Sequence, residues 1–259
     1  MTNIKTPKDL EVMKAGGKIL SQVLWETVGS IKPGVTELDI ENMAERLIEE
    51  KGGEPAFKRV KGYKYATCIS TNEVVVHGIP TERVLKEGDV VGIDCGVYYK
   101  GFNTDMAETL RVSTTNKQQL TNNKKDKIDQ FLEVGKKALE EAIKVAVAGN
   151  HIGHISKTIQ DIVERKSGYA VVRSLIGHGI GKSLHESPEV PGYLNKKIEK
   201  TPRLVPGMTI AIEVIYNMGS YDVVLDKDGW TIASKDGSIS GLFERTVAIT
   251  DKEPMILTA

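Results

Sequence analysis

The chain has 259 residues, and its 35 lysines and arginines are balanced by 35 aspartates and glutamates. This balance gives no overall electrostatic reason to expect binding to nucleic acid or to an anionic membrane. The first residues lack the apolar core of a signal peptide, and no uncharged apolar run approaches the length of a membrane span. The two cysteines, Cys68 and Cys95, form no CxxC pair, which suits a reducing compartment. We therefore expect a cytoplasmic protein without a membrane partner.

The first half of the chain predicts two helices followed by a β-hairpin. Thr6, followed by proline, has the pattern of a helix start, and apolar residues then recur at helical spacing. A Pro-Gly break at residues 33–34 precedes a second amphipathic helix over residues 38–51. Residues 90–98 and 102–112 are strand-like, and a Lys-Gly turn signal lies between them.

The second half of the chain repeats this order after a polar stretch, residues 113–126, which we interpret as an exposed linker. Helical spacing returns over residues 128–143, an Ala-Gly break follows at 148–149, and a second helix is predicted over 152–166. The run at 206–213 then matches the start of the first-half hairpin, because both are glycine-led apolar runs that end in a carboxylate. The sequence therefore contains a weak internal repeat, in which the second half of the chain follows the same order of elements as the first.

The repeat also matches the chemically reactive residues of the two halves. The matched pairs are Asp94 with Glu213, Asp105 with Glu244, and His77 with His178. A carboxylate at the end of an apolar strand is costly to bury unless it is paired or bound to a metal. We expect an α+β fold in which both halves, residues 1–259, form one domain and share a sheet across a pseudo-twofold axis.

The spacing of the acids predicts a two-metal centre. A hairpin centred between Tyr99 and Lys100 would place Asp94 directly opposite Asp105, where two carboxylates repel unless cations bridge them. Glu213 and Glu244 join them by repeat equivalence, together with His178. Four carboxylates and one imidazole suit Mn(II), Fe(II), Co(II) or Zn(II) better than an all-oxygen Mg or Ca site.

Other glycine and histidine patterns do not lead to a second site. The glycine-rich stretch around His178 contains neither GxGxxG nor GxxxxGK[ST], so no nucleotide is expected. His151 and His154 begin a predicted helix and have no partner in the repeat, so we interpret them as surface residues.

Several stretches together resemble the type I methionine aminopeptidases, which have the pita-bread fold. The resemblance extends from Thr6 to Thr258, and its most specific segments are CISTNEVVVHGIP at 68–80, GDVVGID at 88–94, GHGIG at 177–181, LHESP at 184–188, GMTIAIE at 207–213 and MILT at 255–258. The absence of a long N-terminal extension and of a large insertion favours type I over type II.

The resemblance implies a role for each site residue. Asp94, Asp105, His178, Glu213 and Glu244 would bind two divalent metal ions, with Asp105 and Glu244 bridging them. His77 would contact the substrate, His185 would stabilise the tetrahedral intermediate, and Glu213 would shuttle a proton after attack by a hydroxide that bridges the metals. Tyr63, Cys68 and Trp230 would form the methionine pocket, with Leu184 at a position that is often aromatic.

The implied activity is removal of the initiator methionine from nascent proteins and peptides, with small second residues preferred. A monomer is expected, and contact with the ribosome exit region stays open. Lys124, Lys125 and Lys127 are interpreted as a solvated face of the linker.

The sequence departs from the family pattern at two positions, and two other functions on the same fold are alternatives to this activity. Val214 and Arg245 stand where the family usually has Pro and His, and Arg245 would place a permanent cation beside a bridging carboxylate. An Xaa-Pro aminopeptidase or prolidase of the same fold is one alternative, although such enzymes generally carry a large N-terminal domain. A non-catalytic pita-bread protein that binds peptides or RNA is the other, although such proteins lose metal ligands.

Overall fold

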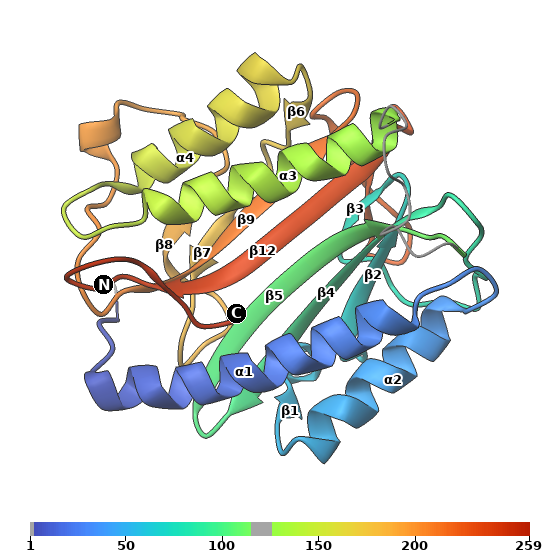
Figure 1. Ribbon diagram of the computed structural model, residues 1–259, viewed down its shortest axis with the longest axis horizontal. Coiled ribbons are helices and arrows are strands. Elements are labelled where there is room, and N and C mark those ends of the chain that lie inside the picture. The colour runs from blue at the N-terminus through green and yellow to red at the C-terminus, as the bar shows by residue number, and fades with distance from the viewer. Residues whose placement is uncertain (1–2, 115–125) are drawn as a thin grey trace.

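The centre of the protein is a ten-stranded antiparallel sheet (Figure 1). The computed structural model describes residues 3–114 and 126–259; most of the expected linker, with Lys124 and Lys125, lies outside the described residues. The strands are β1 (Glu54–Pro55), β2 (Thr67–Thr71), β4 (Val90–Tyr99), β5 (Phe102–Arg111), β6 (Ala170–Val171), β7 (Gly177–Gly179), β8 (Glu186–Val190), β9 (Thr209–Asn217), β12 (Ser240–Ala248) and β13 (Met255–Ile256). Their order is β1-β4-β5-β12-β9-β7-β8, with β2 also beside β4, β6 beside β9 and β13 beside β12. A second, three-stranded sheet has the order β10-β11-β3, formed by Val223–Leu225, Ile232–Ser234 and Val74–Val76.

Two pairs of helices pack against the large sheet. They are α1 (Pro7–Ser30) and α2 (Glu37–Glu50) in the first half, and α3 (Lys127–Lys144) and α4 (Ile152–Gln160) in the second. The predicted helix start is confirmed, because Thr6 and Asp9 form a reciprocal capping box, and Thr36 and Asp39 repeat it at α2. The helix predicted over 152–166 is α-helical only to Gln160 and continues as a π-helical turn. No helix of the described residues is long and apolar enough to cross a bilayer.

The repeat is visible in the sheet itself. The four central strands have the order β4-β5-β12-β9, in which β4 corresponds to β9 and β5 corresponds to β12. The two halves therefore meet where β5 lies beside β12. Figure 1 shows α1 crossing the β4–β5 half and α3 crossing the β9–β12 half. One apolar cluster lies under each helix pair, with Leu24 and Ile93 in the first and Phe131 and Tyr216 in the second. The α+β class and the shared sheet are thus as expected.

The predicted register of the β4–β5 hairpin is wrong by two residues. Asp105 lies opposite Gly96, and Asp94 lies opposite Ala107. The cause is the turn: Lys100 and Gly101 have φ of 46° and 97°, as the two central residues of a type I′ turn require. Because side chains alternate with a period of two, the shift leaves both aspartates on the same face as diagonal neighbours.

Glycine permits the close approach of a helix to the sheet in both halves. A Cβ on Gly17 of α1 would lie 2.1 Å from the carbonyl oxygen of Leu257. A Cβ on the equivalent Gly135 of α3 would lie 2.4 Å from the ring of Phe243 and 2.5 Å from the hydroxyl of Tyr216. Both positions therefore exclude any side chain, which explains a glycine in the middle of each helix.

We expect Gly135→Ala to lower the free energy of unfolding by about 1–3 kcal/mol, because the added methyl overpacks the interface between α3 and the sheet. Gly29→Ala is the matched control, since a Cβ on Gly29 of α1 would meet nothing within 4 Å. The control is expected to be neutral or to stabilise by up to roughly 1 kcal/mol. Urea denaturation of both variants measures the difference, and equal effects would contradict the packing explanation.

Candidate metal centre

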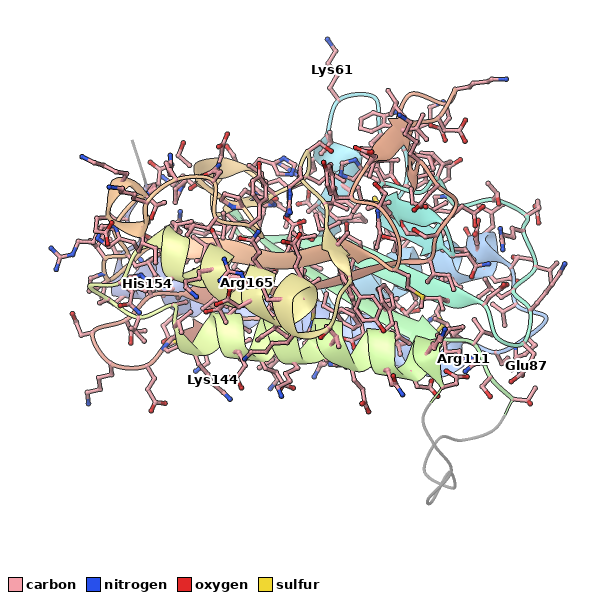
Figure 2. All side chains as sticks on the ribbon, turned by 90° about the horizontal axis from the view of Figure 1, so that it is seen from above. Lys61, Glu87, Arg111, Lys144, His154 and Arg165 are labelled. Atoms are coloured by element: carbon pink, nitrogen blue, oxygen red, sulfur yellow. The ribbon has the colours of Figure 1, made fainter. Side chains whose placement is uncertain are left out.

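All ten residues named as site residues from the sequence line one cavity of about 110 Å³ on the sheet. They are Asp94, Asp105, His178, Glu213, Glu244, His77, His185, Tyr63, Cys68 and Trp230. A larger cavity of about 490 Å³ adjoins it and shares Asp94, His77, His178, His185 and Glu213 with it. In Figure 2, Lys61 and Lys144 of α3 point to opposite sides of the sheet; the cavity wall near Lys61 includes Val60 and Tyr63.

The central strands each present one carboxylate to the small cavity. Asp94 is on β4, Asp105 on β5, Glu244 on β12 and Glu213 on β9, and Glu213 and Glu244 are direct cross-strand partners. The ligand atoms of Asp105, Glu244 and the imidazole of His178 all lie within 4.8 Å of one another. The four carboxylates and the imidazole thus converge.

His178 joins the carboxylates from the neighbouring strand β7. Its Nε2 lies 3.5 Å from Oε1 of Glu213. Its Nδ1 is 2.8 Å from the carbonyl oxygen of Gly179, which favours the tautomer with hydrogen on Nδ1 and leaves Nε2 facing the carboxylates.

Burial and mutual repulsion make the four carboxylates hard to ionise together. Burial is the largest cause for every one, and it raises the pKa of Asp94 to about 7. The pKa values of Asp105, Glu213 and Glu244 are raised well above their usual range, first by burial and then by the neighbouring carboxylates. Burial likewise lowers the pKa of His178 to about 4, which keeps its imidazole neutral.

The donor set fits a bound divalent cation. Oδ1 of Asp94 and Oε1 of Glu244 are buried and have no hydrogen-bond partner. Within residues 3–114 and 126–259, no lysine or arginine forms an ion pair with any of the four carboxylates. Buried acids that lack both protons and cationic partners are strongly unfavourable, whereas carboxylate and imidazole ligands suit borderline divalent metals.

Two further histidines face the junction of the two cavities. His185 follows the loop after β7, and its ring lies 4.4 Å from that of His178 in an edge-to-face arrangement. His77 follows β3 in the left-handed region, with φ of 55°. The next residue must be glycine, since a Cβ on Gly78 would lie 2.0 Å from the carbonyl oxygen of Ile69. Burial lowers the pKa of both His77 and His185, so both are neutral near pH 7.

Aromatic side chains form one wall of the small cavity. The rings of Tyr63 and Trp230 meet edge to face at 5.0 Å, and the hydroxyl of Tyr63 lies 3.2 Å from Sγ of Cys68. Phe57 and Val60 also line this wall. The sequence analysis did not identify Phe57 and Val60 as residues of the cavity. The only feature that could have indicated them is that they are apolar residues within the basic stretch 57–64.

The two departures from the family pattern point away from the cavity. Val214 is fully buried in the apolar cluster under α3. Arg245 bonds to the carboxylate of Glu108 at 3.0 Å and to the carbonyl oxygens of Ala107 and Glu244. Lys136 of α3 contacts the other oxygen of Glu108 at 2.8 Å. The cation that was expected beside a bridging carboxylate is therefore paired on the helix side of the sheet.

Two threonine side chains hold the central strands together on either side of their direct pairing. Strands β5 and β12 pair directly only at two positions. Beyond them, Oγ1 of Thr246 accepts from the N–H of Asp105 at 2.9 Å and donates to its carbonyl oxygen at 2.8 Å. At the other end, Oγ1 of Thr109 makes the same two bonds to Leu242, at 2.9 and 2.7 Å. Only the Thr246 bridge holds a residue of the carboxylate cluster.

Comparison with known proteins identifies relatives of the whole chain. The model of metallopeptidase family M24 matches residues 11–251. The methionine aminopeptidase of Clostridium acetobutylicum is 39% identical over 259 residues, which is 100% of this chain and 99% of that protein. Methionine aminopeptidase 1 of Bacillus subtilis is 39% identical, over 98% of each chain.

Solved structures give the same relationship. The crystal structure of methionine aminopeptidase from Thermotoga maritima has a TM-score of 0.91 and 40% identity, and covers 100% of this chain and 99% of that one. The prolidase from Pyrococcus horikoshii has a TM-score of 0.74 at 22% identity, and only 63% of that chain is covered. The latter likeness shows the fold alone, and together the two confirm the expected pita-bread fold.

We expect Glu244→Gln to raise the free energy of unfolding of the chelator-treated protein near pH 8 by roughly 1–3 kcal/mol, the cost of an unpaired buried polar group. The raised folded pKa means that Glu244 destabilises the fold increasingly as pH rises from its unfolded pKa towards its folded one. The gain should therefore shrink near pH 5.5, and the variant should lose the metal-induced rise in Tm. A less stable variant in chelator near pH 8 would contradict this explanation.

Thr246→Val and Thr109→Val are expected to lower stability by similar amounts, about 1–2 kcal/mol each, because each removes equivalent buried hydrogen bonds. Only Thr246→Val should weaken Co(II) binding, by roughly 10- to 100-fold, since only that bridge holds a residue of the carboxylate cluster. Calorimetric titration with Co(II) and the Co(II) absorption spectrum measure the difference. Equal Co(II) affinities in the two variants would show that Thr246 is merely structural.

Proposed function

The chain belongs to metallopeptidase family M24, and we propose that it removes the N-terminal methionine from peptides and nascent proteins by metal-dependent hydrolysis. The observation that carries the proposal is the convergence of four carboxylates, two of them buried and two half-buried, and a neutral histidine beside a pocket with an aromatic wall. The full-length relatives named methionine aminopeptidase support the same activity. The proposed catalytic domain takes in both halves, because one sheet runs through them.

Five residues would hold the metal in this proposal: Asp94, Asp105, His178, Glu213 and Glu244. We propose two divalent ions, because two pairs of carboxylates meet there and one ion would leave part of their repulsion uncompensated. Co(II), Mn(II), Fe(II) and Zn(II) all suit the donor set. Bound ions would supply Lewis-acid polarisation of the scissile carbonyl and make water acidic enough to ionise near neutral pH.

The chain's own groups would manage the protons and the developing charge. Glu213 lies where the two cavities join, so its carboxylate can accept a proton from the attacking water and return it to the leaving amine. His185, kept neutral by burial, can donate a hydrogen bond to the oxyanion. His77, held by its constrained backbone, would orient the peptide at the same junction.

The cavities explain why a single terminal residue would be removed. Tyr63 and Trp230 form one wall of the small cavity, whose volume of about 110 Å³ suits the side chain of a single terminal residue. A thioether suits this wall, because sulfur makes favourable contacts with aromatic rings. The rest of the substrate would leave through the larger cavity, and we propose that a small second residue is preferred, as the resemblance implies.

The proposed setting is cytoplasmic, which two free thiols, Cys68 and Cys95, support. The monomeric state and contact with the ribosome stay predictions.

We expect metal-restored protein to release free methionine from Met-Ala-Ser and little leucine from Leu-Ala-Ser, and chelator to abolish the release. Glu213→Gln should lower kcat by about 10²- to 10⁴-fold, the range for loss of a general base. Glu199→Gln, the same change at an exposed position outside both cavities, is the control. No release from Met-Ala-Ser by folded protein with any of the four metals would refute the proposed activity.

A further inference from the structure

The small sheet connects the catalytic cavity to an exposed apolar edge. Strand β3 leads directly into His77, and β11 pairs with β3. The connection between β10 and β11 carries Trp230, whose ring lies against Tyr63 in the cavity wall. The β10–β11 hairpin is therefore fixed to the site at two points, and its outer strand β10 pairs only with β11 among the described strands.

Three apolar side chains form a row across the three strands of this sheet. Val76 on β3 is opposite Ile232 on β11, and Ile232 is opposite Leu225 on β10. Direct cross-strand partners lie on the same face, so the three side chains are consecutive neighbours. Exposure rises along the row, because Val76 is 4% exposed, Ile232 is half-buried and Leu225 is 59% exposed.

The inner end of the row is part of the larger cavity. Val76, Leu175 and Ile215 line that cavity, and the same apolar cluster includes Ile232 and Val223 of the hairpin. The apolar cluster thus extends from the cavity to Ile232, and Leu225, the cross-strand partner of Ile232, continues the row to the edge of the hairpin. Leu225 is the most exposed large apolar side chain of the described residues, and a solvent-exposed leucine at the end of such a surface favours contact with an apolar partner.

We propose that Val76, Ile232 and Leu225 form a docking surface for an apolar side chain of the substrate polypeptide, downstream of the bond that is cut. The inference rests on the proposed function, because the occupant is the chain that leaves the larger cavity. Two strand spacings separate Val76 from Leu225, about 10 Å. An extended peptide covers this distance in about three residues. Because Val76 lines the larger cavity beside His77, the second or third residue of the substrate would lie there, and Leu225 would meet roughly the fifth or sixth residue.

The surface adds selectivity beyond the terminal methionine and the second residue. An unfolded polypeptide with apolar residues at positions five and six gains contact with the row, whereas a tripeptide is too short to reach Leu225. Partial burial of one leucine side chain corresponds to a roughly three- to tenfold gain in kcat/KM. Folded substrates cannot present such a segment in extended form.

The test compares Met-Ala-Ser-Ser-Leu-Leu with Met-Ala-Ser-Ser-Ser-Ser and with Met-Ala-Ser in the metal-loaded enzyme. Leu225→Ser removes the outer end of the row, and Leu225→Met keeps it apolar. Val224→Ser is the matched control, because Val224 is 51% exposed but points to the opposite face of β10. Thermal denaturation checks that all variants are folded.

We expect the wild type, Leu225→Met and Val224→Ser to prefer the leucine hexapeptide by roughly three- to tenfold, and Leu225→Ser to lose the preference. The loss should lie in KM, and all four proteins should cleave Met-Ala-Ser equally well. The proposal is overturned by no preference in the wild type, by equal losses in Leu225→Ser and Val224→Ser, or by a dimer that Leu225→Ser dissociates. Failure of the wild type to cleave even Met-Ala-Ser would instead refute the proposed activity.

Discussion

The protein is organised around four carboxylates, two buried and two half-buried, that converge without a lysine or arginine partner in the described structure. Such a cluster is unfavourable on its own, so the surrounding fold must hold the acids in place until a cation compensates their charge. Adjacent strands do this well, because ladder hydrogen bonds fix their backbones, and a threonine hydroxyl takes over this role at Asp105. The helices pack on the opposite face and stabilise the sheet without contributing to the site.

The pseudo-twofold arrangement explains how the cluster is assembled. Each half contributes one hairpin-like strand pair with two acids, and the halves meet where β5 and β12 run side by side. Threonine bridges lie on both sides of this junction, but the repeat that matches Asp105 with Glu244 does not match Thr246 with Thr109, and only Thr246 contacts a cluster residue. Symmetry therefore builds the scaffold, and the differences between the halves distinguish the functional end of the junction from the structural one.

In the proposed function, substrate selection would come from the segments that the symmetry does not relate. The loop around Tyr63 and the hairpin that carries Trp230 meet in one wall of the small cavity, and the loop after β7 adds His185. These segments are attached to the rigid sheet, so their side chains keep fixed positions relative to the carboxylates. The same attachment carries the apolar row from Val76 to Leu225 out to the surface.

The sequence alone determined the helix starts and the repeat with its matched carboxylates and histidines, because capping patterns, periodicity and matched strand ends are local signals. The other four residues of the cavity, Tyr63, Cys68, His185 and Trp230, were named only through the resemblance to a known family. It also indicated the correct face for Asp94 and Asp105, since a register shift of two residues preserves the side-chain alternation. Only the tertiary structure decided that register, through the positive φ values at Lys100 and Gly101. It also decided the pairing of Arg245 with Glu108, the Thr246 bridge and the outer surface of β10, because these depend on contacts between residues far apart in the chain.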